Sequence, residues 1–155
     1  MLVDKRTEFA DNVDVQNAPG TANVGNQIPL GVAREVGGGD SGKLSVVIYV
    51  TETFAAPSTD GTIQFQVASD NTASIATDGT QSIHVKSKAF AEAELVAGLK
   101  IVLDLPVQQD GAEPYETFLG LQAVTALQTF TAGAVHAFLS RDIGSQVHYP
   151  APGQA

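Results

Sequence analysis

Thr62-Ile63-Gln64-Phe65-Gln66-Val67-Ala68 is the stretch that decides the fold class of this chain. Its apolar residues Ile63, Phe65 and Val67 alternate with uncharged Thr, Gln and Ala. Because successive side chains of a strand point to opposite faces, this alternation predicts a strand with one dry and one wet face. The wet face carries no charge and no acid, base or nucleophile. The stretch therefore favours a β-protein that presents surfaces over one that runs a reaction.

The same alternation recurs along the chain, and no long amphipathic helices are interleaved with it. This gives roughly seven strands at spacings typical of sandwiches and barrels, so a parallel α/β sheet is disfavoured. We expect an all-β fold, an antiparallel β-sandwich. Ser69–Gln81 is predicted as a long loop, and Glu92–Gly98 is ambiguous because helix formers end there on a glycine. The expected strands are Ile28–Arg34, Lys43–Thr51, Thr62–Ala68, Ser82–Lys88, Leu99–Leu105, Tyr115–Val124 and Ala132–Leu139.

The two ends of the chain differ in composition from the middle. Residues 1–27 are dense in charge and end near the turn signal Asn17-Ala18-Pro19-Gly20, so we expect an N-terminal arm there, with a weak helical turn near Thr7–Asn12. Residues 28–141 form the predicted sandwich. Residues 142–155 contain prolines and a glycine and predict an extended C-terminal tail.

Composition excludes several classes of protein. The 155 residues fit one domain, which buries roughly 70% of its unfolded surface. The lack of cysteine excludes disulfides, thiolate metal sites and thiol nucleophiles. The formal charge of −9 argues against nucleic-acid binding and suits solubility or a basic protein partner. No apolar run approaches the ~20 residues of a membrane span, and Met1–Asp14 has no apolar region of a secretory signal.

Gly37–Lys43 spells most of a phosphate-binding loop, G-x-x-x-x-G-K. Such a loop needs a Ser or Thr directly after the lysine and a helix that follows, whose amides receive the phosphates. Leu44 follows here, and the next segment alternates as a strand. The stretch is therefore interpreted as a flexible connection, and no cofactor is expected.

Other candidate chemistry is equally sparse. His84, His136 and His148 lie on separate segments, His84 and His136 on the expected wetter faces, so no metal centre is predicted. Nothing resembles a nucleophile elbow, and no catalytic residue is assigned. An incidental divalent ion in the Asp70–Gly79 loop stays open, as does a carboxylate pair of a glycosidase. With three Tyr and no Trp, a sugar-stacking groove is poorly supplied.

Several stretches, in order and covering most of the chain, resemble the jelly-roll capsid cement, or decoration, proteins of tailed bacteriophages such as some podoviruses. They are Leu2-Val3-Asp4-Lys5, Gly39 ahead of Leu44-Ser45-Val46-Val47-Ile48, Thr62 to Asp70, Leu95-Val96-Ala97-Gly98, Leu103-Asp104-Leu105-Pro106, Tyr115 leading into Phe118-Leu119-Gly120-Leu121, and Phe130-Thr131-Ala132-Gly133-Ala134-Val135. The resemblance implies a jelly roll and a homotrimer on the outer surface of the virion. There it would clamp neighbouring subunits of the major capsid protein, with no catalysis, no cofactor, no nucleic acid and no membrane involved.

The arm provides the candidate contact residues of such a protein. We hypothesise that its apolar side chains pack on the capsid or a neighbouring protomer and that its basic side chains set the register; the residues are Leu2, Val3, Lys5, Arg6, Phe9 and Val13. The alternative is that the apolar residues cap the chain's own sandwich. A competing function is a carbohydrate- or receptor-binding module, which would need exposed aromatic residues; an enzyme ranks third.

Overall fold

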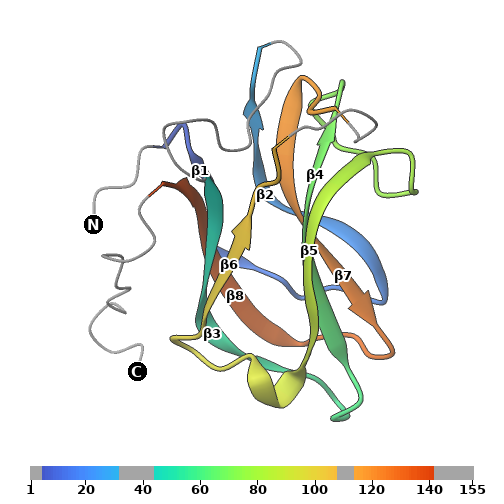
Figure 1. Cartoon of the computed structure of the whole chain (residues 1–155). Coiled ribbons are helices and arrows are strands. Elements are labelled where there is room, and N and C mark those ends of the chain that lie inside the picture. Colours follow the sequence, from blue (N-terminus) through green and yellow to red (C-terminus); the bar gives the residue numbers. More distant parts are fainter. Residues whose placement is uncertain (1–4, 32–43, 108–113, 142–155) are drawn as a thin grey trace.

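A computed structural model describes residues 5–31, 44–107 and 114–141 of the chain. Eight strands form two four-stranded antiparallel sheets (Figure 1). No helix among these residues is long and apolar enough to cross a membrane. The elements are β1 (Glu8–Asp14), β2 (Gly20–Pro29), β3 (Ser45–Ala55), β4 (Thr62–Asp70), β5 (Ser82–Ala91), the short 3-10 helix η1 (Glu92–Glu94), β6 (Lys100–Asp104), β7 (Phe118–Ala126) and β8 (Ala132–Ser140).

The strand order identifies the sandwich as a jelly roll. One sheet runs β1-β8-β3-β6 and the other β2-β7-β4-β5, so most successive strands cross from one sheet to the other. This is the eight-strand, two-Greek-key arrangement of jelly rolls. The predicted all-β antiparallel sandwich and its jelly-roll form are confirmed. Figure 1 shows the two sheets as the two layers of the sandwich.

The core lies between the inner faces of the sheets. In β4, Ile63, Phe65 and Val67 are fully buried, as the alternation predicts. In β3, Val46, Ile48 and Val50 join the same core, whereas Val47 and Tyr49 on the opposite face belong to a separate cluster. The period-2 pattern therefore assigned the inner faces of these strands correctly.

The expected arm over residues 1–27 is wrong for the part that the structure describes. Glu8–Asp14 is strand β1, paired with β8, and β2 begins at Gly20, so both strands belong to the sandwich. The helical turn expected at Thr7–Asn12 is likewise absent from this segment. Two register shifts and the positive φ of Asn12 (52°) break the alternation, which hid the strand from pattern analysis.

Most remaining strand predictions are confirmed within a few residues. The exception is Ile28–Arg34, because β2 occupies Gly20–Pro29 and residues 32–43, including Gly37–Lys43, lie outside the described residues. The predicted tail over 142–155 also lies outside them. The ambiguous Glu92–Gly98 contains only η1 as regular structure, while the predicted loop after β4 is confirmed.

Candidate functional site

The candidate contact residues of the N-terminus do not form one exposed surface. Phe9 is fully buried in the sandwich core, and Val13 is partly buried against it. Lys5 and Arg6 are exposed, while Leu2 and Val3 lie outside the described residues. Phe9 is therefore a core residue rather than a contact residue, because β1 turns its ring between the sheets; the alternative that it caps the chain's own sandwich is confirmed.

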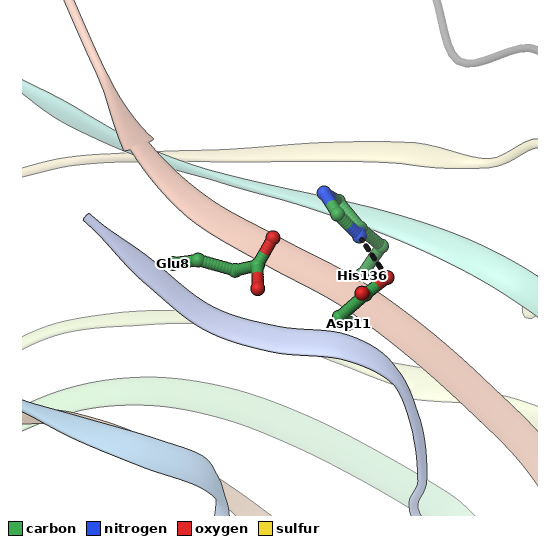
Figure 2. A group of neighbouring side chains, drawn as sticks. All are labelled: Glu8, Asp11 and His136. Carbon is green, nitrogen blue, oxygen red and sulfur yellow. Dashed lines mark hydrogen bonds and ion pairs between the residues drawn. The ribbon is translucent and has the colours of Figure 1, made fainter. Parts of the chain in front are cut away.

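Lys5 belongs to a charged cluster with Glu8 and Asp11 of β1 and His136 of β8. Figure 2 shows the last three of these side chains. Its ammonium contacts the Glu8 carboxylate at 2.8 Å and the Asp11 carboxylate at 3.3 Å. Asp11 also lies 3.3 Å from Nδ1 of His136. The hydrogen bond from Lys5 holds the pKa of Asp11 below its ordinary value, and the two carboxylates raise the pKa of Lys5.

The same cluster has the composition of a divalent-cation site. Glu8, Asp11 and His136 each offer a ligand atom within 4.8 Å of the others, which neither spacing nor periodicity predicted. The Lys5 ammonium already supplies positive charge to both carboxylates, so a metal ion would have to displace it. The arrangement is better suited to fastening the start of β1 onto β8 than to holding a metal.

Half of the polar face of β4 is buried, contrary to expectation: Gln66 and Ala68 are buried, whereas Thr62 and Gln64 are partly exposed. Gln66 is 2% exposed and donates to Oε1 of Gln122 on β7 at 2.9 Å. Gln81 donates to the same oxygen at 3.2 Å, and Nε2 of Gln122 donates to Asn23 and to the backbone oxygen of Ala76. Every donor and acceptor of the Gln122 amide is thus engaged. These hydrogen bonds offset the desolvation cost of burying the uncharged layer.

The loop over residues 71–81 covers this layer. Ile75 is 1% exposed and lies over Gly120 of β7, where an added Cβ would stand 2.4 Å from Cδ1 of Ile75. Asn23 donates to the Ile75 oxygen at 2.8 Å. The predicted wet face of β4 is therefore covered by the chain itself at Gln66 and Ala68.

The acidic residues of this loop are engaged with its own backbone. Asp70 accepts from the amides of Thr72 and Ala76, and Asp78 accepts from the amide and hydroxyl of Thr80. These bonds to Asp78 lower the pKa of its carboxyl. The carboxylates thus shape the turns, as short acidic side chains commonly do.

His84 is partly buried rather than fully exposed on a wet face. In the β4–β5 pairing Val67 faces Val85 and Ala68 faces Ile83, so His84 is the unpaired residue of a bulge. Its ring stacks on Tyr115 at 4.0 Å, and its Nε2 lies 2.7 Å from Oγ of Ser69. Burial lowers the pKa of His84 to about 4, so the ring is neutral at pH 7.

Ser69, His84 and Glu116 lie near one another without the geometry of a hydrolytic triad. Ser69 is fully buried, and its Oγ also accepts the amide N–H of Glu116 at 3.0 Å. The Glu116 carboxylate accepts from Ser82 at 2.6 Å. A triad needs an accessible nucleophile and a carboxylate that orients the histidine. The Ser69–His84 pair is therefore a structural contact between β4 and β5.

The aromatic side chains of the described chain are buried, apart from Phe118, which is partly buried. On the outer face of the β1-β8-β3-β6 sheet, Tyr49 stacks on Phe138 with ring centroids 6.2 Å apart, and both are at most 3% exposed. Burial raises the pKa of Tyr49. Among the residues that the structure describes, no Tyr or Phe is in the exposed class. A sugar-binding groove would lack stacking platforms there.

Exposed large apolar side chains are few in the described ranges: Val96, Val107 and Leu127. Leu127, in the turn between β7 and β8, is the most exposed at 70% and has a positive φ of 68°. Sequence analysis did not single it out, because one leucine after a strand gives no periodic signal.

Comparison with known proteins then places the chain. A model of the Bbp16 family matches residues 12–139, which is most of the sequence. The chain belongs to the Bbp16 family. The match extends from within β1 to within β8, so the Bbp16 region corresponds to nearly the whole jelly roll. A search of curated proteins finds no match.

Proposed function

We propose that this chain is a non-enzymatic structural protein of a tailed-phage virion. It binds the outer surface of the capsid as a homotrimer and stabilises the shell by clamping neighbouring subunits of the major capsid protein. The jelly roll carries the proposal, because this arrangement recurs in viral capsid and lectin domains. The stretches that resemble phage cement proteins, among them Thr62 to Asp70 and Phe130 to Val135, form strands β4 and β8 or lie directly before them.

The polar groups support a surface-presenting role over a catalytic one. The buried amides of Gln66 and Gln122 bond to each other, and the buried hydroxyl of Ser69 bonds to His84. These groups hold the fold together and are not aimed at a substrate. Clamping needs many modest contacts that add by avidity, which a rigid sandwich in three copies supplies.

The competing function, a carbohydrate- or receptor-binding module, is less well supported. Lectin domains also use jelly rolls, but sugar binding favours exposed aromatic rings. The rings of Tyr49 and Tyr115 are buried, and Tyr149 lies outside the described residues.

Capsid co-sedimentation tests the proposal. Purified protein is mixed with empty shells of the cognate phage that lack it, and bound protein is measured after sedimentation. We expect saturable binding and a higher melting temperature of the decorated shell. Light scattering should give three times the 16.1 kDa chain mass. A monomer that ignores shells but binds on a glycan array would overturn the proposal in favour of the competing one.

A further inference from the structure

The β7–β8 turn exposes a leucine in a strained backbone conformation. The amide of Gln128 donates to the oxygen of Ala126 at 2.8 Å, which closes a three-residue γ-turn around Leu127. The positive φ of Leu127 (68°) belongs to the rare, strained form of this turn, in which bulky residues are uncommon. Such strain persists only where the surroundings hold it, and it concentrates at binding sites.

The residues before and after this turn are held in place, and Ala126 before it pairs with Thr62 of β4. Phe130 is 1% exposed, packs edge-on against Phe54, and donates its amide to Asn17. The next amide, of Thr131, donates to the oxygen of Ala55 at 2.8 Å. Leu127 is therefore presented by a fixed frame, so little conformational entropy is lost when its side chain is buried by a partner.

The flank of the turn is acidic. Gly61 lies close to Gln128, with an added Cβ at 3.1 Å from Cβ of Gln128, and its oxygen accepts the amide of Glu92 at the start of η1. Asp60, beside Gly61, is exposed. The nearby Lys88 forms an ion pair with Glu94, so its positive charge is already balanced by that carboxylate. Asp60 thus places an exposed carboxylate near the turn that presents Leu127.

We propose that Leu127 is the anchor that docks this chain into an apolar pocket rimmed by basic side chains on the capsid protein. The inference rests on the proposed function and adds the contact surface and the partner's chemistry. Protein interfaces commonly have an apolar core inside a polar rim, and charges at the rim steer association.

The test is Leu127→Asn, because asparagine tolerates positive φ and keeps the turn while it removes the apolar side chain. We expect the affinity of each protomer for shells to fall about tenfold or more, because the variant no longer buries an apolar side chain on binding. The melting temperature of the free protein should not fall. Val107→Asn, at the opposite end of the sandwich, is the matched control and should bind as wild type does. Asp60→Asn should make the affinity for shells less sensitive to salt concentration, because it removes a charge at the rim.

Three results would overturn the inference. Leu127→Asn could bind shells as tightly as wild type. Val107→Asn could weaken binding by the same factor, which would indicate a nonspecific effect. Leu127→Asn could lower the mass measured by light scattering, which would assign the turn to a contact between copies of the chain. Wild-type protein that ignores shells would instead refute the proposed function itself.

Discussion

Acidification should destabilise this protein through His84, and His84→Gln should remove that sensitivity. The folded state lowers the pKa of His84 to about 4, against an ordinary 6.5. As pH falls below 6.5, His84 therefore becomes protonated in the unfolded chain but stays neutral in the folded chain. The stability that His84 contributes is complete above pH 6.5 and is lost progressively as pH falls to about 4.

The size of the loss follows from the two pKa values. Their difference corresponds to at most about 3 kcal/mol in the free energy of unfolding. Because the imidazole is only partly buried, solvent screening should reduce this to about 1–2 kcal/mol. The cause is local: protonation places a charge on a partly buried ring that is stacked on Tyr115.

Denaturant unfolding of wild type and His84→Gln between pH 7.5 and pH 4.5, at one protein concentration, measures the effect. The wild type should lose about 1–2 kcal/mol more than the variant across this range. At pH 7.5 the variant carries a constant offset from the lost ring stacking, which the comparison across pH removes. Exposed carboxylates with lowered pKa values, such as Asp11 and Glu94, are common to both proteins and cancel. Parallel stability curves for the two proteins would refute the reasoning.

Three further changes test the packing. Gln122→Ala should cost about 3 kcal/mol or more in a denaturant titration, because two buried and two partly buried hydrogen bonds lose their partner. A cost under about 1 kcal/mol would contradict the satisfied polar layer. Phe9→Ala should cost about 3–5 kcal/mol by the same measurement, since its ring is fully buried, whereas a true arm residue would cost almost nothing. Gly120→Val should displace Ile75 and speed protease cleavage within residues 71–81, with unchanged cleavage as the contrary result.

The sandwich was readable from sequence wherever strands obey strict alternation. The buried face of Thr62–Ala68 was predicted correctly from the alternation of its residues. Each inner position is apolar, and no bulge interrupts that face in the β4–β7 pairing. The strand in residues 8–14 was missed because Phe9 and Ala10 are both buried in succession and bulges shift its register. A strand whose pairing is irregular loses the period on which prediction depends.

The candidate sites were less predictable because they join residues far apart in the chain. Glu8 and Asp11 meet His136 across two strands, and Ser69 meets His84 only through a bulge. The strained conformation of Leu127 depends on the neighbouring turns that hold it. Neighbours of this kind are set by pairing register, which no local pattern records.

The sequence alone determined that the chain is an all-β sandwich, because alternation of apolar residues is a local consequence of strand geometry. Its composition also identified Gln64, Gln66 and Ala68 as a face without charge. Only the tertiary structure decided that Gln66 and Ala68 on this face are buried rather than exposed, since the 71–81 loop returns over it and Gln122 completes its hydrogen bonds. Burial of a polar group depends on finding its partners, and those partners come from distant parts of the chain.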